Sequence, residues 1–262
     1  MSEQTQRYRD GPGYDRGIGE WSRLMGKVFL EWLAPDRGWR WIDIGCGTGA
    51  FTQQVIDLAA PSQIDGIDPS EQQLAIARKR VYTASVTFHQ CNASALPFAE
   101  DNFDAAVMAL VLPFVPEPAK GVAEMVRVVA PGGVVAAYMW DQLREGGFPS
   151  EPIVAELRGM GVNHPAPPSV GATRMEMLPE LWINAGLHAV ETREISVERT
   201  FADFDEFWTL STGSNIGQTI SAMADGEPKR LKERVRSRLE ADTAGRITFS
   251  SRANAIKGRV PR

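Results

Sequence analysis

The sequence predicts an α/β fold, a Rossmann-like, doubly wound and mostly parallel sheet with helices on both faces. Three observations predict it. Short apolar stretches alternate with helical patterns over residues 39–140. A glycine-rich turn joins the first such stretch to the next helix, and the run 103–112 is apolar almost throughout, as in a strand buried on both faces. Right-handed crossovers then place a ligand crevice at the carboxyl ends of the strands.

The composition and net charge of the chain disfavour several classes of function. The chain has 262 residues, of which 43% are hydrophobic and 23% charged, which is typical of a globular protein. A net charge of -5 disfavours nucleic-acid binding. Two cysteines and three histidines are too few for a zinc cluster, so no metal site is expected. The polar start and the lack of an apolar run near 20 residues predict a cytoplasmic protein without a membrane span.

The first elements follow from periodicity. Residues 1–18 are polar and rich in Gly and Arg, so we expect a flexible arm, followed by a single domain over 19–262. A helix comes next, ended by Pro35. Its apolar stripe repeats every 3.6 residues and consists of Trp21, Leu24, Met25, Val28, Phe29 and Trp32.

Strands and helices then alternate. Ser70 is expected to cap a helix, with Gln73 completing a capping box, and a turn at 131–133 precedes the fifth strand. A further helix is expected over 119–129. The five expected strands are 39–44, 64–67, 86–88, 103–112 and 134–140.

The pattern loosens after Trp140. Residues 144–173 are expected to be loop with a short helix, and a helix over 178–185 ends at Gly186. Two β-rich stretches, 188–200 and 246–257, close the chain. Between them lies a helical insert over 201–245, too long for a simple hairpin loop.

The segment DIGCGTG, residues 43–49, carries the clearest motif. Its glycines allow a sharp strand-to-helix turn and let a ligand approach the main chain. Asp68 ends the second strand, where an acidic side chain can accept both hydroxyls of a ribose; a turn or capping aspartate is the alternative. The glycine pattern alone also fits a dinucleotide-binding enzyme.

The longer segment WIDIGCGTG, residues 41–49, resembles the first motif of class I S-adenosylmethionine-dependent methyltransferases, especially small-molecule enzymes related to quinone biosynthesis. Further pieces follow in the family's order: GIDPS at 66–70, CNASALPF at 91–98, FD at 103–104 and PGG at 131–133. The resemblance implies a seven-stranded sheet whose last strand is antiparallel and at the edge. It also implies that the insert covers the acceptor site beside the cofactor methyl.

The resemblance implies S-adenosylmethionine as cofactor and S-adenosylhomocysteine as product. The glycine loop would hold the methionine moiety, Asp68 the ribose, Asn92 and Ala93 the adenine, and Leu110 would lie near methionine and ribose. Many relatives carry Asp where this chain has Asn92. The residues expected to bind the cofactor are Asp43, Gly45, Cys46, Gly47, Asp68, Gln73, Asn92, Ala93, Leu110, Tyr14 and Arg23.

Gln73 and Arg23 each have an alternative role. Gln73 could flank the adenine or serve only in the capping box. Tyr14 and Arg23 lie in the segment that relatives fold over the cofactor. Arg23 could pair with the cofactor carboxylate or remain solvated at the surface.

Methyl transfer from a sulfonium needs alignment more than a nucleophilic residue, and a base only for a protonated acceptor. We therefore assign no catalytic residue; the histidines 89, 164 and 188 and Asp141 are the base candidates. The predicted activity is methyl transfer to a small-molecule acceptor. The alternatives are an NAD-binding oxidoreductase and a non-catalytic S-adenosylmethionine-binding protein. The residues specify neither the acceptor nor the oligomeric state.

One further feature is a basic run late in the insert. Apolar residues occur within this run at helical spacing, which is typical of an amphipathic helix with a solvated basic face. Nucleic-acid binding is the less favoured interpretation. The run comprises Lys229, Arg230, Lys232, Arg234, Arg236 and Arg238.

Overall fold

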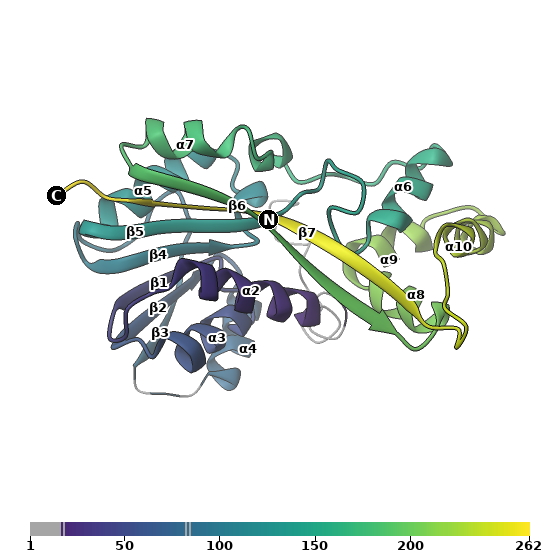
Figure 1. Ribbon diagram of the computed structural model, residues 1–262, viewed down its shortest axis with the longest axis horizontal. Helices are drawn as coiled ribbons and strands as arrows, with labels where there is room; N and C mark the ends of the chain where they lie inside the picture. The colour runs from purple at the N-terminus through teal and green to yellow at the C-terminus, as the bar shows by residue number, and fades with distance from the viewer. Residues whose placement is uncertain (1–16, 18, 82, 84) are drawn as a thin grey trace.

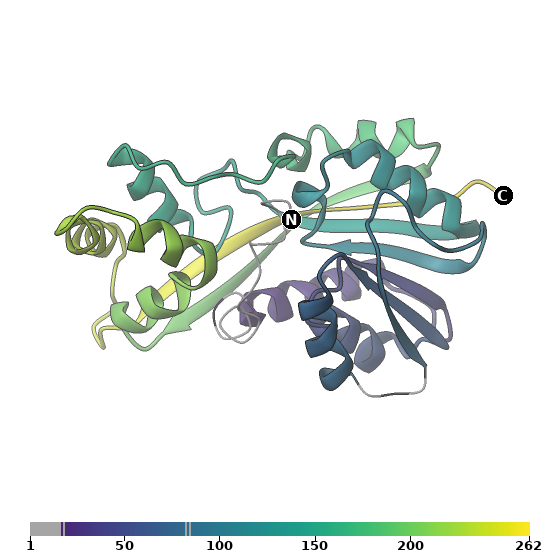
Figure 2. The ribbon, with the colours of Figure 1, turned by 180° about the vertical axis from the view of Figure 1, so that it is seen from behind.

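A computed structural model describes residues 17, 19–81, 83 and 85–262. The expected arm, apart from Gly17, lies outside the described residues. The described part forms one seven-stranded sheet in the order β3-β2-β1-β4-β5-β7-β6, with helices on both faces (Figures 1 and 2). The predicted fold class is confirmed.

The parallel half of the sheet follows the sequence pattern. Strands β1 to β5 form four parallel pairs, β3–β2, β2–β1, β1–β4 and β4–β5. Their bounds are β1 Arg40–Ile44, β2 Gln63–Asp68, β3 Val86–Gln90, β4 Phe103–Ala109 and β5 Val129–Trp140. The helices of this half are α2 Glu20–Leu33, α3 Ala50–Ala59, α4 Glu71–Arg80 and α5 Pro118–Val128, with a short 3₁₀ turn, η3, at Leu112–Phe114.

Two details of this half differ from expectation. Strand β4 ends at Ala109 rather than 112, because Leu110 adopts a left-handed backbone with φ of 64°. The expected turn at 131–133 is instead an irregularity inside β5, where the register with β4 shifts between Phe103 and Ala105. Gly132, with φ of 84°, accommodates that shift.

The remaining elements build the insert and its connections. They are α6 Glu151–Gly159, η4 Val170–Thr173, α7 Leu178–Asn184, β6 His188–Phe201, α8 Phe204–Ser211, α9 Ser214–Ser221, α10 Glu227–Arg238 and β7 Ile247–Arg259. The predicted helical insert between two late strands is therefore present. Helix α6 lies with the insert helices rather than on the sheet (Figure 1).

The expected position of the last strand is wrong. Strand β7 is antiparallel to both of its neighbours, but it lies between β5 and β6, and β6 forms the edge. Residues 253–259 of β7 pair with β5, whereas 247–252 extend past Trp140 and pair with β6. The pair therefore continues beyond the carboxyl edge of the sheet as a ribbon and carries the insert there (Figure 1).

Two apolar layers cover the sheet. Helices α2 and α3 pack on one face through Phe29, Phe51 and Val55, and α5 and α7 pack on the other through Met125 and Trp182. The first layer continues without interruption into the insert. The insert residues in it include Phe204, Phe207, Ile216, Leu231 and Val235.

Candidate functional site

The glycine loop between β1 and α3 sits at the carboxyl edge of the sheet. The backbone N–H groups of Gly45 and Cys46 donate to the carbonyl of Ile67 at 2.8 and 2.9 Å, which ties the loop to β2. A Cβ on Gly45 would lie 2.4 Å from a methyl of Val111, so no side chain fits there. Among the described residues, a Cβ on Gly47 would meet only the Gly45 carbonyl oxygen, at 4.0 Å, so none of them fills this side of the loop.

Asp68 joins the loop to the end of β2. Its Oδ2 accepts the Gly47 N–H at 3.1 Å, and its Oδ1 accepts the Ser70 N–H at 2.8 Å. Burial raises the pKa of the Asp68 carboxyl, and these two N–H groups act in the opposite direction. The structure thus brings Asp68 and the glycine loop into direct contact, as the sequence predicts.

Asp43 lies beneath the loop and is 1% exposed. The Thr52 hydroxyl donates to its Oδ2 at 2.6 Å, while Oδ1 is buried without a hydrogen-bond partner among the described residues. Burial raises the pKa of Asp43 to about 7; the Thr52 bond lowers it, and the nearby Asp68 adds to the rise. An unpartnered buried carboxylate oxygen is costly, and a cationic ligand group would satisfy it.

The residues expected at the adenine lie beyond β3. Asn92 is exposed and forms a bridge with Ala95, and the half-buried Ala93 packs against the second apolar layer. The pKa of the Cys91 thiol is raised by burial and by the charge of Asp68, so this segment adjoins the Asp68 site. The thiol of Cys46 is buried, and burial raises its pKa well above the usual value.

The capping box is only half present. Ser70 is the N-cap of α4, and its hydroxyl accepts the backbone N–H of Gln73 at 3.4 Å. The Ser70 N–H, which a capping box gives to the side chain at this position, donates to Asp68 instead. The Gln73 side chain is buried one turn from Asp68.

Leu110 follows β4 at the same edge. Its left-handed backbone is unfavourable for a leucine and is held by an N–H bond to the Tyr138 carbonyl at 2.7 Å. Such strain clusters at ligand sites, because the surrounding structure must impose it. The observed conformation is consistent with the role that the resemblance implies for Leu110.

The structure does not bring Arg23 to the loop. Its guanidinium donates two hydrogen bonds to Glu20 on the same face of α2, at 2.9 and 2.8 Å, and its side chain is 56% exposed. This arrangement matches the surface alternative. Tyr14 lies outside the described residues.

The candidate general bases lie in different parts of the fold. His89 is bound to the buried Asp65 at 2.7 Å, which gives it a structural role. His188 is exposed at the start of β6, beside the amino end of β5, far from the loop. His164 contacts the Thr219 hydroxyl of the insert at 2.9 Å.

Asp141 follows β5, and its backbone N–H donates to the Arg252 carbonyl at 3.2 Å, which continues the β5–β7 ladder. Among the described residues, the Asp141 side chain has no hydrogen-bond partner that would mark it as a base. Among the residues that the structure describes, no group of His, Cys, Asp or Glu could hold a metal ion. Within the same part of the chain, no helix is both long and apolar enough to cross a bilayer.

Sequence reasoning missed two supporting residues. Thr52 lies fully buried on α3, and a hydroxyl among apolar neighbours would have indicated a buried acceptor such as Asp43. Arg80, at the end of α4, donates to the Thr48 hydroxyl at 2.8 Å and so fixes the glycine loop from the outside. No local sequence pattern connects Arg80 to Thr48, because the bond spans 32 residues.

The basic run lies on α10, and several of its members pair within the insert region. Arg234 and Arg238 both donate to Glu156 of α6, at 2.6 and 3.3 Å. Lys232 and Arg236 pair with Asp205 of α8 at 2.8 and 3.2 Å. These contacts use the basic face to join α6, α8 and α10.

Residues 42–137 match the family model described as "Methyltransferase domain". The chain is 34% identical over 116 residues to demethylmenaquinone methyltransferase of Desulfitobacterium hafniense, covering 42% of this chain and 46% of that protein. It is 28% identical over 207 residues to the O-methyltransferase cnsE of Penicillium expansum, covering 77% and 71%. The chain thus spans about half the length of the menaquinone relative.

Solved structures agree on the fold. Haemonchus contortus phosphoethanolamine N-methyltransferase 2, solved with S-adenosyl-L-methionine, superposes with a TM-score of 0.63 at 20% identity, covering 100% of this chain and 61% of that one. The matched segment contains the β1 loop, Asp68 and the end of β4. Residues 42–137 therefore match a methyltransferase domain, in agreement with the resemblance to class I S-adenosylmethionine-dependent methyltransferases that the sequence motifs indicated.

Proposed function

We propose that this protein transfers a methyl group from S-adenosylmethionine to a small-molecule acceptor. The observation that carries the proposal is the cluster at the carboxyl edge, in which Asp68 bonds to the Gly47 N–H beside the unpartnered Oδ1 of Asp43. An NAD-binding oxidoreductase would use a similar edge, but no comparison favours it.

The residues present fit the cofactor. Its methionine part carries an ammonium group, and Asp43 supplies a desolvated carboxylate oxygen that needs a cationic partner. The open side of Gly47 leaves room for a ligand against the main chain. Asp68 retains acceptor capacity for two ribose hydroxyls, since each carboxylate oxygen has one N–H donor and a second lone pair.

Bound S-adenosylmethionine would supply an electrophilic methyl on a sulfonium, with a neutral thioether as leaving group. The protein's part is to hold that methyl and the acceptor atom in line. Alignment of this kind is equivalent to roughly 10⁵–10⁸ M of reactant. Asp43, Asp68 and the glycine loop would fix one reactant, and Leu110 would limit its movement at the end of β4.

The insert would position the other reactant. The ribbon of β6 and β7 carries it past the carboxyl edge of the sheet, the same edge as the glycine loop. Helices there would exclude water and confine a small acceptor, as proposed from the sequence. The name of the demethylmenaquinone relative supports methylation of a small molecule, and the name of the cnsE relative supports methyl transfer. The free thiols of Cys46 and Cys91 support a cytoplasmic location.

Two experiments test the proposal. Calorimetry should detect S-adenosylhomocysteine binding, with no binding of NADH at the same concentrations. A screen with methyl-labelled S-adenosylmethionine against metabolite extract should then yield a labelled small molecule, identified by mass spectrometry. Tight cofactor binding with no labelled product would favour the non-catalytic alternative, and NADH binding would favour the oxidoreductase.

A further inference from the structure

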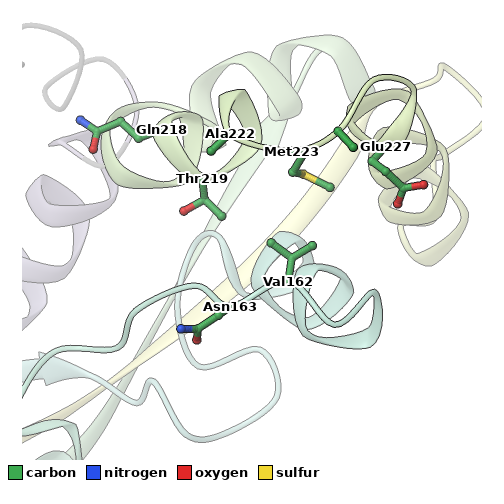
Figure 3. Close-up of a pocket in the computed structure, with 8 residues that line it drawn as sticks. Val162, Asn163, Gln218, Thr219, Ala222, Met223 and Glu227 are labelled. Carbon is green, nitrogen blue, oxygen red and sulfur yellow. The ribbon is translucent and has the colours of Figure 1, made fainter.

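A cavity of about 560 Å³ lies within the insert region, away from the glycine loop. One wall is the loop after α6, with Val162 and Asn163, and the other is α9 with the start of α10 (Figure 3). Its volume falls in the range that accommodates small organic ligands. Nothing in the methyltransferase motifs accounts for it, because they all lie before residue 140.

The lining defines the chemistry of a ligand. Val162, Ala222 and Met223 make much of the surface apolar, and Figure 3 shows the Val162 and Met223 side chains facing one another across the space. The side-chain amides of Asn163 and Gln218 are exposed at the open rim of the cavity and make no hydrogen bond to another described residue, so a ligand can replace the water bound to them.

The charge of the side chains that line the cavity disfavours anionic ligands. Among the lining residues that the structure describes, Glu227 is the one ionised side chain, and none is a lysine or an arginine. Its carboxylate is weakly compensated, since the Arg230 contact is 3.4 Å long and at the surface. A phosphate or carboxylate would meet a like charge without a cationic partner, which is unfavourable.

The cavity is linked to the predicted methyl site through one chain segment. Ser169, at the far end of the loop, donates through its N–H to the Pro113 carbonyl at 3.0 Å and through its hydroxyl to the Val115 carbonyl at 2.7 Å. Pro113 lies in η3, directly after the strained end of β4. Five residues lie between Asn163 and Ser169, so the wall lies within about 20 Å of η3 along an extended chain.

We propose that this cavity binds the part of the methyl acceptor remote from the methylated atom, and that this acceptor is a largely apolar small molecule, uncharged or cationic and without an anionic group. The assignment as acceptor site rests on the proposed methyl transfer. The binding site itself rests on the cavity and its lining alone.

A matched ligand series tests it on the full chain. The probes are 2-naphthol, 2-(aminomethyl)naphthalene and 2-naphthoate, which share a ring system and differ in charge. Binding is followed by NMR of ¹³C-methyl methionine, with the Met223 signal assigned from the Met223→Leu variant. The neutral and cationic probes should shift the Met223 signal saturably, and 2-naphthoate should not at equal concentration.

Ala222→Phe should fill the cavity and weaken the binding of the neutral probe at least about tenfold. Asn163→Phe fills the cavity from the other wall. Weaker binding by this variant as well would show that misfolding of α9 is not the cause. Ala244→Phe, in the exposed turn before β7, is the matched control and should bind as the wild type does. A shift with 2-naphthoate equal to that with 2-naphthol, no shift with any probe, or unchanged binding in both filled variants would overturn the proposal.

Calorimetry of S-adenosylhomocysteine on the same proteins separates the two proposals. Both filled variants should retain wild-type affinity for it, because the cavity is distinct from the Asp43–Asp68 cluster. Probe binding without S-adenosylhomocysteine binding would reject the methyltransferase function and leave the cavity as a ligand site. Once the labelled product is identified, Ala222→Phe should raise the KM of its acceptor and leave the KM of S-adenosylmethionine unchanged; unchanged KM for the acceptor would reject the acceptor assignment.

Discussion

Asp68 holds the glycine loop from the neighbouring strand, with its Oδ2 3.1 Å from the backbone nitrogen of Gly47. The same carboxylate accepts the N–H of Ser70, so it organises both the loop and the start of α4. The side chain that we propose as the ribose ligand thus also supports the backbone around the proposed site.

Asp68→Ala should therefore weaken S-adenosylhomocysteine binding at least about tenfold, because hydrogen bonds to a charged acceptor contribute roughly 1.5–3 kcal/mol each. It should also lower the Tm, since two backbone donors lose their acceptor. Calorimetry and thermal unfolding measure the two effects. Asp57→Ala, an exposed aspartate on α3, is the control. Wild-type affinity in folded Asp68→Ala would exclude the ribose role.

Gly47→Val should abolish cofactor binding and leave the protein folded. The valine has space in the free protein, but it occupies the open side of the loop and must adopt a left-handed φ of 54°. That conformation costs about 1–2 kcal/mol. Gly38→Val is a matched control, because Gly38 has φ of 80° and no atom within 4 Å of its added Cβ, outside the site. Both variants should lose similar stability, and normal binding by Gly47→Val would contradict the loop assignment.

Asp43 should make stability depend on pH in a defined direction. Its pKa rises from 3.8 to about 7 on folding, because burial disfavours the carboxylate. The folded state thus binds this proton more tightly than the unfolded state does. Protonated Asp43 therefore contributes its full stabilisation below pH 4, and this stabilisation is lost as pH rises through 7. Relative to Asp43→Asn, the free energy of unfolding of the wild type should fall by up to about 1.4 kcal/mol per pH unit in this range.

Urea unfolding of both proteins at several pH values between 4 and 8 measures this difference. Asp57→Asn, whose carboxylate is on the α3 surface, should show no such trend against the wild type. A difference between wild type and Asp43→Asn that is independent of pH would mean that Asp43 titrates normally.

Replacement of residues 205–243 by a Gly-Ser linker should preserve S-adenosylhomocysteine affinity and destroy turnover. The hydrogen bonds of the cofactor cluster lie between residues 43 and 70, outside the deletion. The deletion does expose Phe201, whose ring lies 5.2 Å from that of Phe207, so a lower Tm is expected. Glu156→Gln is a milder test, because it keeps the insert but weakens its pairing with Arg234 and Arg238. Turnover that survives the deletion would refute the cover role.

The parallel sheet and its edge could be predicted because their signals are local. A buried strand, a glycine turn and an acid at the next strand end occur within 30 residues, and each residue's type reports its own environment. The contact of Asp68 with Gly47 follows once the two strands are known to be parallel neighbours. The capping role of Ser70 is similarly local.

Other features depend on long-range packing and could not be predicted in this way. The order of β6 and β7 is decided by which strand pairs with β5, and that pairing joins residues more than 110 positions apart in the sequence. The left-handed turn at Leu110 ends β4 early, although leucine gives no sign of it. Glu156 pairs with Arg234 and Arg238 of α10 from 78 and 82 residues away, so these arginines resemble a solvated surface when the run is viewed alone.

The β6–β7 ribbon also has a mechanical consequence. Six residues of β7, 247–252, extend past the last β5 pair and run beside β6 for roughly 20 Å. Asp141 adds one bond to Arg252, and Trp21 of α2 packs against Phe249 on this ribbon. A rotation of about ten degrees at its base moves its tip by roughly 3.5 Å, about one strand residue. The backbone twist where β5 releases β7, near Trp140 and Ala253, therefore sets how far the insert stands from the glycine loop. Residues at this base can tune that spacing without touching either reactant.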